Sequence, residues 1–415
     1  MSTISQPVNM CRICQEVTLQ TILDFGEIYL TGVFLENGGD VDKAPMSLAQ
    51  CGRCGLVQLE HEYSQGALYG ESYGYESHLN QSMVDHLKRK ARLLESRFLN
   101  HLKFPIVVDI ASNDGTLLSG FQNEDSKLIG IDPLLNIVSD YYPKNSIKIE
   151  SFFSKDSYFD KLSEKANLVT SLSVLYDLPD PKRFVSDIYD ILDEGGVWHF
   201  EQSYLPTMVE TLSYDTICHE HLLYLSMHDI LNLTESVGFQ IESASLNSVN
   251  GGSIAVTAIK SKEIIKRDPF VDFLLRKEID QGYQDLSAMK KFAIAAERHR
   301  ESLKELIMKY ADTATQIFAL GASTKGNVLL QWAELTHELI SSVGDVNPRK
   351  FGKETPGTKI PIESENWPLE KFGSGSIGIV LPWHFRDGIV RNCEKYLANG
   401  GRLLFPLPNI QIVSG

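Results

Sequence analysis

Short apolar runs alternate with amphipathic stretches through the middle of the chain. A helical period runs from residue 79 to 102, where apolar side chains recur on one face and lysines and arginines lie opposite. Apolar runs predict strands at 107–110, 129–131, 147–149, from 166 onward and at 197–201, and helices are expected between them at 116–121, 133–142 and 184–192. This alternation predicts a largely parallel, doubly wound α/β sheet.

A second α/β unit follows a helical, charged stretch at 263–310. Its strands are expected at 316–320, 342–346, 376–381 and 402–406, and a helix is expected at 328–335. The turn at 321–327 has two glycines, but Asn327 stands where a Walker loop requires lysine, so ATP hydrolysis is not supported. Backbone amides at the start of this helix could still hold a diphosphate, with Lys325 as counter-ion.

Four of the six cysteines form two pairs near the N-terminus, Cys11-Arg-Ile-Cys14 and Cys51-Gly-Arg-Cys54. Two thiolates separated by two residues can face one metal ion when the backbone turns tightly, and Gly52 and Gly55 permit such a turn. Four sulfur atoms complete a tetrahedral zinc shell with no open position, so we expect one structural zinc ion per chain. A redox pair, the alternative, would need only one of the two motifs.

The first strand of the middle unit leads into a small polar turn. It comprises Asp109 at the strand, followed by Ala111, Ser112, Asn113, Asp114 and Gly115. Strand, turn and helix in this order are typical of nucleotide-binding units, and the next strand ends in Asp132, a carboxylate suited to a ribose diol. The arrangement suits S-adenosylmethionine (SAM), although Ala111 and Asn113 stand where glycines are common. An α/β unit without a ligand is the alternative.

The mostly apolar segment 214–226 contains His219-Glu220-His221. Such groups are costly to bury without a purpose, and a histidine backed by a carboxylate suits proton abstraction. We expect His221 to be the base, with Glu220 and His219 as its nearest rivals. On an extended segment the two histidines would share one face. A satisfied polar pair in the core is the alternative interpretation.

A tyrosine-rich segment precedes the long helix. It contains Tyr69, Tyr73 and Tyr75. These residues either pack between domains or form a lid over the active site, where their hydroxyls would contact the substrate or the methionine carboxylate of SAM.

Length and charge restrict the class of protein. A chain of 415 residues is expected to form two or three domains. No run of about 18 apolar residues occurs, and the N-terminus lacks the basic and apolar regions of a secretory signal. We therefore expect a cytoplasmic location and no membrane partner. The net charge of −15 repels a phosphate backbone, which disfavours nucleic acid as a partner.

Taken in order, these motifs resemble the SAM-dependent nucleotide-sugar C-methyltransferases of deoxysugar and branched-sugar biosynthesis. The similar elements cover nearly the whole chain: the two cysteine pairs, Tyr73 and Tyr75, the turn from Asp109 to Gly115, Glu220-His221, Asn250-Gly251-Gly252, and the turn from Gly321 to Gly326. The resemblance implies an α/β protein of three domains. These are a small zinc-binding domain at 1–66, a class I SAM methyltransferase domain with a leading helix at 67–262, and a Rossmann-like C-terminal domain at 263–415.

The resemblance also implies roles for individual residues. His221 would be the base, Glu220 would lie beside it, and Tyr75 would lie near the reaction centre. SAM would bind at Asp109, Ala111, Ser112, Asn113, Asp114, Gly115 and Asp132, and at Ser171 and Val174 near the end of a later strand. A nucleoside-diphosphate sugar would lie between the middle and C-terminal domains, near Tyr73, Asn250, Ser323 and Lys325.

The reaction implied is methylation of the carbon next to the ketone of a 4-keto sugar. A base within about 3 Å removes the acidic proton, and the enolate takes the methyl group in line in a site that excludes water. A tyrosine hydroxyl or His219 would face the keto oxygen. A sugar O- or N-methyltransferase and a zinc-ribbon binding protein with a degenerate SAM fold are the alternatives. The sugar, the nucleotide and the oligomeric state stay open.

Overall fold

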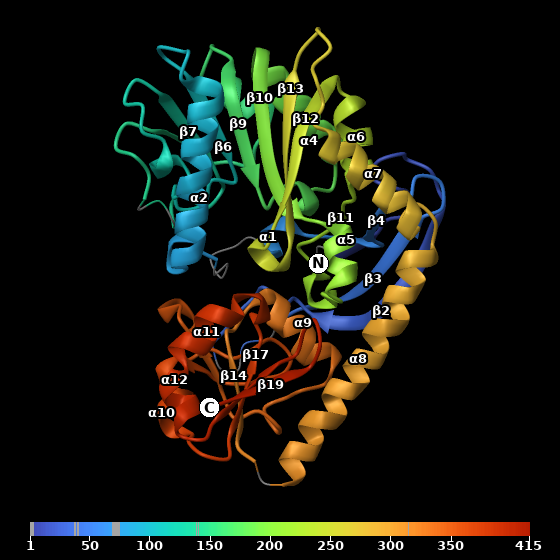
Figure 1. The fold of residues 1–415 in the computed structure, drawn as a ribbon, viewed down its shortest axis with the longest axis vertical. Coiled ribbons are helices and arrows are strands. Elements are labelled where there is room, and N and C mark those ends of the chain that lie inside the picture. Colours follow the sequence, from blue (N-terminus) through green and yellow to red (C-terminus); the bar gives the residue numbers. More distant parts are fainter. Residues whose placement is uncertain are drawn as a thin grey trace.

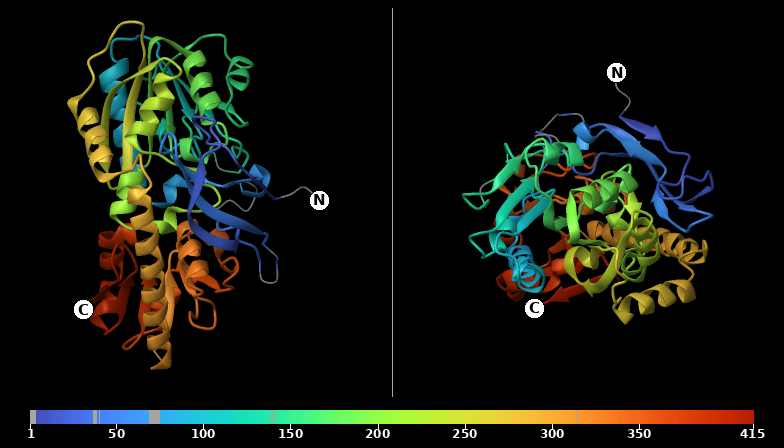
Figure 2. Two further views of the ribbon diagram at one scale, coloured as in Figure 1. Left: turned by 90° about the vertical axis from the view of Figure 1, so that its right-hand side faces the viewer. Right: turned by 90° about the horizontal axis from the view of Figure 1, so that it is seen from above.

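The computed structural model describes residues 4–36, 39, 41–68, 75–137, 139, 141–313 and 315–415. Within these residues the strands form four sheets, of which a seven-stranded sheet fills the upper part of Figure 1 and a six-stranded sheet the lower part. The N-terminal strands lie beside the junction of these two parts, as the side view in Figure 2 shows. Among the described helices, none combines the length and the hydropathy that crossing a membrane requires.

The N-terminal sheet is antiparallel and includes one strand from the middle of the chain. Its order is β11 (Leu223–Tyr224), β4 (Val57–Leu59), β3 (Lys43–Cys51) and β2 (Leu19–Tyr29). Two short strands, β1 (Ser5–Pro7) and β5 (His61–Tyr63), form a separate pair, and helix α1 spans Gln65–Leu68. Leu223 pairs with Gln58, and the Leu59 N–H donates to the Leu222 carbonyl over 3.0 Å. The residues that follow His221 therefore belong to the N-terminal sheet.

The middle sheet confirms the doubly wound arrangement expected from the sequence. Its order is β12 (Phe239–Asn247), β13 (Ser253–Lys260), β10 (Leu192–Ser203), β9 (Ala166–Leu172), β6 (Ile106–Ile110), β7 (Lys127–Ile131) and β8 (Ile147–Ile149). The strands from β10 to β8 are parallel, whereas β13 is antiparallel to both of its neighbours. Carboxyl ends of parallel strands meet at one edge of a sheet, so the turns that follow β6, β7 and β9 lie close together.

Helices flank this sheet. They are α2 (Gln81–Leu94), which continues into a π-helical turn (Glu95–Leu99), α3 (Lys155–Phe159), α4 (Pro181–Ile191), α5 (Leu205–Glu210) and α6 (Met227–Glu235). The helix expected at 79–102 is thus confirmed over most of its length. The one expected at 116–121 is reduced to a 3-10 turn, Leu118–Gly120. The one expected at 133–142 is wrong, because its described residues form turns and irregular chain.

Contacts with the turn after β6 explain the missing helix. The Tyr141 N–H donates to the Asp114 carbonyl over 3.0 Å, and the hydroxyls of Tyr142 and Ser112 are 2.5 Å apart. The Tyr142 ring also covers Gly115 and Gly130, where an added Cβ atom would lie 2.4 Å from the ring. These tertiary contacts draw the end of the segment onto the turn and override its weak helical propensity.

The C-terminal part is a second parallel sheet with one antiparallel edge strand. Its order is β16 (Ile362–Ser364), β15 (Val343–Asp345), β14 (Ile317–Leu320), β17 (Ile377–Val380), β18 (Arg402–Phe405) and β19 (Gln411–Ser414). Its helices are α9 (Thr324–Trp332), α10 (Asn366–Lys371), α11 (Arg386–Asn392) and α12 (Glu394–Ala398). Helices α7 (Pro269–Gln281) and α8 (Ser287–Asp312) connect the two sheets, and α8 runs along the side of the molecule in Figure 1.

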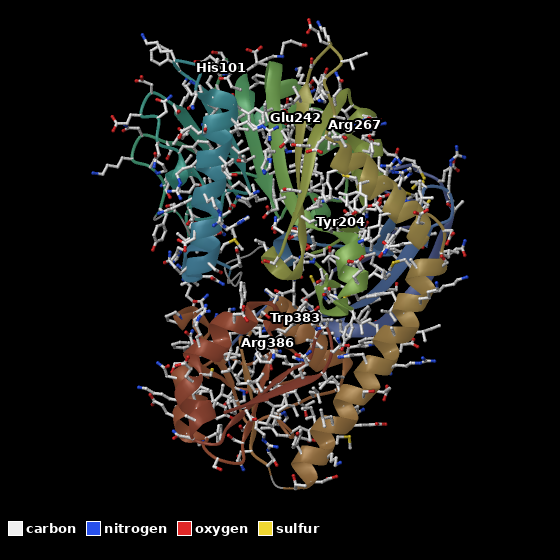
Figure 3. All side chains as sticks on the ribbon, viewed as in Figure 1. His101, Tyr204, Glu242, Arg267, Trp383 and Arg386 are labelled. Carbon is white, nitrogen blue, oxygen red and sulfur yellow. The ribbon has the colours of Figure 1, made fainter. Side chains whose placement is uncertain are left out.

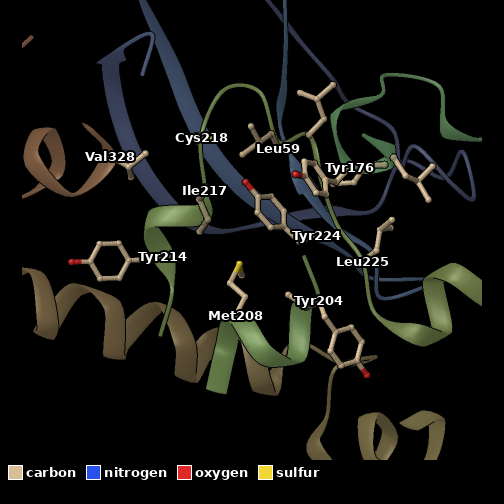
Figure 4. Packing of buried hydrophobic residues seen from close by; sticks show 14 of the residues in the cluster. Leu59, Tyr176, Tyr204, Met208, Tyr214, Ile217, Cys218, Tyr224, Leu225 and Val328 are labelled. Carbon is tan, nitrogen blue, oxygen red and sulfur yellow. The ribbon is translucent and has the colours of Figure 1, made fainter. Parts of the chain in front are cut away.

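One hydrophobic cluster contains residues of all three parts. Trp332 at the end of α9 packs against Phe25 of β2 and against Tyr214 of the middle part, with ring centroids 4.7 and 4.9 Å apart. Figure 4 shows the adjoining core, in which Leu59 of β4, Tyr224 of β11 and Val328 of α9 are labelled. The three parts therefore share a core, and α9 packs against the other two.

A buried carboxylate fastens α2 to the middle sheet. Glu201 of β10 accepts hydrogen bonds from His86 Nε2 and Lys90 Nζ of α2, each over 2.8 Å, and from Asn247 Nδ2 over 2.9 Å. Burial alone would raise the pKa of Glu201, but the hydrogen bond from His86 and the charge of Lys90 prevail and lower this pKa to about 2.

We predict that Glu201→Gln lowers the free energy of unfolding by about 2 kcal/mol near neutral pH, because Lys90 loses its buried counter-ion. The pKa of Glu201 lies below its ordinary value of 4.5 in the folded state, so the wild-type advantage exists above pH 4.5 and disappears as the pH falls toward 2. Urea unfolding at several pH values measures the difference.

Glu242→Gln is the matched control, because its partner Arg97 is largely exposed. It should change stability by less than about 0.5 kcal/mol. A difference between wild type and Glu201→Gln that stayed constant down to acidic pH would contradict this account.

Candidate functional site

The four N-terminal cysteines bring their sulfur atoms together. The Sγ atoms of Cys11, Cys14, Cys51 and Cys54 all lie within 4.8 Å of one another. Those of Cys11 and Cys54 are 3.5 Å apart, and those of Cys14 and Cys51 are 3.6 Å apart. A tetrahedron with zinc–sulfur bonds of about 2.3 Å has edges of about 3.8 Å. The cluster therefore fits one zinc ion, as the cysteine spacing predicted.

Each cysteine pair lies on a tight turn closed by a backbone hydrogen bond. The Gln15 N–H donates to the Cys11 carbonyl over 2.9 Å, and the Gly55 N–H to the Cys51 carbonyl over 3.0 Å. Gln15 and Gly55 both have left-handed backbone angles, with φ of 61° and 83°. Strand β4 begins at Val57, directly after the second turn. The metal therefore fixes the start of the strand that pairs with β11.

The turn after β6 has the left-handed backbone that glycines usually supply. The φ angles of Ala111, Asn113 and Gly115 are 54°, 49° and 84°. The Asn113 N–H donates to Asp132 Oδ2 over 2.9 Å, so the turn and the end of β7 are in direct contact. The structure thus brings together the two elements that the sequence assigned to SAM.

Aspartates surround this turn, and three of them are almost fully buried: Asp109, Asp114 and Asp132. Burial raises the pKa of Asp109 to about 7, although the hydrogen bond from the Thr170 hydroxyl opposes the shift. Burial also raises the pKa of Asp132. Each oxygen of Asp132 accepts one backbone N–H, from Asn113 or Leu134, and retains acceptor capacity for a ligand hydroxyl.

The segment before α2 lies across this turn. The Ser77 N–H donates to Asn113 Oδ1 over 3.0 Å, and Asn113 Nδ2 donates to the Tyr75 carbonyl over 3.1 Å. These bonds bring Tyr75 to the turn, where its side chain is 47% exposed. Tyr69 and Tyr73 lie outside the described residues.

The end of β9 also borders this edge of the sheet. Ser171 is buried, and its hydroxyl accepts a hydrogen bond from Trp198 Nε1 over 3.0 Å, so its side chain is engaged in the core. Val174, which lies beyond the strand, is only partly buried. The geometry therefore favours Val174 over Ser171 as the residue of this segment that can touch a ligand.

His221 lies on a turn rather than on an extended segment. Its Nδ1–H donates to the Thr216 carbonyl over 2.7 Å, which leaves Nε2 as the unprotonated nitrogen of the neutral ring. The ring stands edge-on to Tyr176, with centroids 4.4 Å apart. Burial lowers the pKa of His221 to about 3, and the positive charge of Lys325 contributes to the shift. His221 is therefore neutral, with one nitrogen able to accept a proton.

The other two residues of the motif point elsewhere. His219 packs edge-on against Tyr63 of β5, with ring centroids 4.8 Å apart, and burial lowers its pKa to about 4. Glu220 is buried against Gly32, where an added Cβ atom would lie 2.0 Å from Oε1. The Ala44 backbone opposes the shift of the His219 pKa, and burial raises the pKa of Glu220 although hydrogen bonds from Cys218 and Thr31 oppose that rise. The expected carboxylate behind His221 is therefore corrected to the Thr216 carbonyl, because the turn sends Glu220 away.

Residues of the C-terminal part meet this segment from the other side. Lys325 Nζ donates to the Asn250 carbonyl over 2.7 Å, and the Ser323 hydroxyl caps α9 by accepting the Gly326 N–H over 3.1 Å. Burial lowers the pKa of Lys325, and the negative charge of Asp215 opposes that shift. His221, Asn250 and Lys325, which the sequence singled out separately, therefore gather at one junction.

Three residues of this junction were not identified from the sequence: Asp215, Trp383 and His384. Trp383 Nε1 donates to Asp215 Oδ2 over 2.8 Å, and Figure 3 shows Trp383 where the C-terminal part faces the middle part. Asp215 is fully buried, and its Oδ1 has no hydrogen-bond partner among the described residues. The available signal was the position of Trp383 and His384 directly after the predicted strand at 376–381, where ligand-binding residues of such sheets gather.

The cavities among the described residues include two in the middle part. A very small one, about 10 Å³, adjoins His221 and is lined by aromatic and apolar residues that include Tyr176, Tyr224 and Met208. A larger one, about 340 Å³, lies between α2 and strands β10, β12 and β13, on the face of the sheet. The first is large enough for no more than about one water molecule.

We predict that the purified protein carries one zinc ion per chain and that Cys51→Ser lowers both the zinc content and the turnover. Stability should fall by several kcal/mol, because folding of such a module depends on its metal. Turnover should fall because the Cys51 turn precedes β4, which holds the strand next to His221. Elemental analysis and thermal unfolding measure these effects.

Cys393→Ser is the matched control, since Cys393 is a buried cysteine outside the cluster. It should leave the zinc content unchanged. If the wild-type protein were folded but contained no zinc, the assignment of the four-cysteine cluster as a zinc site would be wrong.

Comparison with known proteins gives the same order of parts. A domain model whose description names zinc binding matches residues 11–69, a methyltransferase domain matches 77–244, and a C-methyltransferase C-terminal domain matches 248–408. The C-methyltransferase NovU of Streptomyces niveus is 28% identical over 425 residues, covering 100% of this chain and 99% of the relative.

Solved methyltransferase structures are similar to a part of the chain. Magnesium protoporphyrin IX methyltransferase from Synechocystis PCC 6803, determined with bound SAM, is 15% identical and covers 45% of this chain and 80% of its own, with a TM-score of 0.30. The CurJ carbon methyltransferase is 10% identical and covers 45% and 57%, with a TM-score of 0.35. The chain thus carries a zinc-binding domain, a methyltransferase domain and a C-methyltransferase C-terminal domain in this order, and with its full-length C-methyltransferase relative these identify it as a SAM-dependent C-methyltransferase.

Proposed function

We propose that the enzyme methylates the carbon next to the ketone of a 4-keto nucleoside-diphosphate sugar, with His221 as the base. The observation that carries this proposal is the orientation of His221. Its Nδ1–H is held by the Thr216 carbonyl, and its Nε2 is left to accept a proton at the junction with Lys325 and Asn250. A neutral imidazole fixed in one tautomer is what proton abstraction from carbon requires.

SAM is proposed to bind at the turn Ala111–Gly115, which we call the cofactor turn. The left-handed backbone there allows close approach of the amino-acid end, and Asp132 can accept both ribose hydroxyls. When bound, SAM supplies the methyl group that the substrate carbon accepts. Tyr75, carried beside the cofactor turn by the segment before α2, is proposed to border the reaction centre.

The diphosphate is proposed to lie at the start of α9. Free N–H groups and the helix dipole favour an anion there, and Lys325 adds a positive charge at the same place. The sugar would then extend toward Asn250 and His221, in agreement with the contact between Lys325 and the Asn250 carbonyl. A bound diphosphate would also offset the charge of Lys325 and so raise the pKa of His221 toward its working range.

Charge that develops on the keto oxygen needs a hydrogen-bond donor. His219 is not suited to this role, because it packs against Tyr63 in the N-terminal part. The hydroxyl of Tyr224 is buried, accepts a hydrogen bond from the Cys218 backbone and so keeps its own proton to donate, and lines the same small cavity as His221. Tyr224 and Tyr75 are therefore the proposed donors.

We further propose domain limits at 1–66, 67–262 and 263–415, with β11 crossing the first limit to join β4. The second candidate reaction is O- or N-methylation of a sugar, which needs no ketone and no loss of a C–H bond. The name of the full-length relative, a C-methyltransferase, favours carbon methylation. Exchange of the substrate C–H with deuterated water separates the two reactions.

We predict that Asp132→Ala weakens SAM binding by about 1–3 kcal/mol, the usual cost of removing a buried hydrogen-bond partner. Calorimetric titration with SAM measures the change. Asp132→Asn keeps one acceptor oxygen and should lose less. Native affinity in Asp132→Ala would refute the placement of the ribose.

We predict that His221→Asn lowers turnover by about 10²- to 10⁴-fold, the range for loss of a general base. Exchange of the substrate C–H with deuterated water should fall in parallel, while SAM affinity stays native. Nuclear magnetic resonance of a 4-keto nucleotide sugar incubated with each variant measures exchange.

His219→Gln is the control, because His219 is close in sequence but lies against the N-terminal strands. This variant should have a lower free energy of unfolding. Its rate of substrate C–H exchange, measured per folded enzyme molecule, should equal that of the wild type. Native exchange in His221→Asn would show that another group removes the proton.

A further inference from the structure

The segment Tyr75–Leu79, which we call the strap, is held on the cofactor turn by both backbone and side chains. The His78 N–H donates to Asp114 Oδ2 over 2.8 Å, and His78 Nδ1 lies 3.0 Å from the same oxygen. The Ser77 N–H donates a hydrogen bond to Asn113 Oδ1. Two successive N–H groups of the strap therefore depend on the side chains of two successive residues of the cofactor turn.

The strap also reaches the C-terminal part. Glu76 Oε1 lies 3.2 Å from an Arg349 guanidinium nitrogen, and Glu76 Oε2 lies 3.7 Å from His78 Nδ1. The Glu76 side chain is only 10% exposed, whereas that of Arg349 is 49% exposed. Arg349 is in turn fixed at its backbone, because its N–H donates to Asn347 Oδ1 over 2.9 Å. This ion pair joins residues that are distant in sequence, one in the segment before α2 and the other in a turn of the C-terminal part.

The turn that carries Arg349 touches the start of α9. It is a 3-10 turn, Pro348–Lys350, that follows β15. Lys350 Nζ donates to the Ala322 carbonyl over 2.6 Å and lies 3.7 Å from Asp345 Oδ2. Ala322 directly precedes Ser323, the residue that caps α9. Direct contacts therefore run from the cofactor turn through Glu76 and Arg349 to the proposed diphosphate site.

We propose that Glu76 and Arg349 are positioning residues that couple SAM binding at the cofactor turn to the nucleotide-sugar site at the start of α9. This inference rests on the proposed function, which supplies both ligands. SAM on the cofactor turn stabilises the side chains of Asn113 and Asp114 that hold the strap, and the strap then presents Glu76 to Arg349. Coupling of this kind is reciprocal, so the sugar nucleotide strengthens SAM binding by the same factor.

The size of the effect follows from the surroundings of the pair. An exposed ion pair contributes little, because water and salt screen it. Here the carboxylate is mostly buried and the Arg349 backbone is held by Asn347, so less ordering is needed when the pair forms. We expect a coupling of roughly two- to five-fold in affinity, at the lower end of measured allosteric effects.

Hydrogen–deuterium exchange of the full-length protein, with and without S-adenosylhomocysteine, tests the proposal without a sugar substrate. In the wild type, the ligand should slow exchange both in the strap and in residues 346–351. In Glu76→Gln and in Arg349→Gln, it should still slow exchange in the strap, but the effect at 346–351 should be lost. The double variant should behave as either single variant does, because both remove the same link.

Two controls keep the result specific. Arg349→Lys retains the charge and should restore part of the effect at 346–351. Arg267→Gln breaks an ion pair with Glu235 of α6, which does not link the strap to residues 346–351, and should leave the effect intact. If S-adenosylhomocysteine binds and slows exchange at 346–351 equally in the wild type and in Glu76→Gln, the coupling is wrong. If it does not bind at all, the proposed SAM site itself fails.

Discussion

The pairing of β11 with β4 is the constraint on which the arrangement of the site depends. Through it, a strand of the zinc-bearing sheet fixes the segment that directly follows His221, and the Leu59 N–H binds the Leu222 carbonyl. The zinc turn at Cys51–Cys54 sets the start of β4, so a metal site without an open position still bears on the position of the proposed base. The small N-terminal part thus forms one wall of the proposed active site. It also contributes the surface against which His219 and Glu220 are buried.

Helix α9 supplies the opposite wall. Its Trp332 packs against the N-terminal sheet, and its Asn327 side chain donates a hydrogen bond to the Thr31 carbonyl. Its first turn faces the middle part, where Lys325 donates to the Asn250 carbonyl. One short helix thus sets the distance between the C-terminal sheet and His221. Lys325 also lies among Asp215, His221 and His384 at the junction, where its charge is balanced by the buried Asp215 and helps burial to lower the pKa of both histidines.

Local patterns in the sequence predicted most of the fold and the zinc site. Alternating apolar runs identified the parallel strands, and the spacing of the cysteine pairs identified the cluster, because both signals repeat within a few residues. The errors came from contacts between distant segments. The helix expected at 133–142 is replaced by turns because Tyr141 and Tyr142 bind the cofactor turn. The Thr216 carbonyl, and not Glu220, holds His221, and the two histidines do not share one face, because the motif turns where an extended segment was expected. No pattern in the local sequence predicts that β11 joins the N-terminal sheet. None predicts the hydrogen bond that Trp383 donates to Asp215.

The central claim is that the methyl group is transferred to carbon at a position activated by a ketone. The most direct test is to incubate the enzyme with SAM that carries a ¹³C-labelled methyl group and with 4-keto nucleoside-diphosphate sugars, and then to trace the label in the product by nuclear magnetic resonance. The account predicts a new carbon–carbon bond between the labelled methyl group and the carbon adjacent to the carbonyl. Label found on oxygen or nitrogen would contradict it.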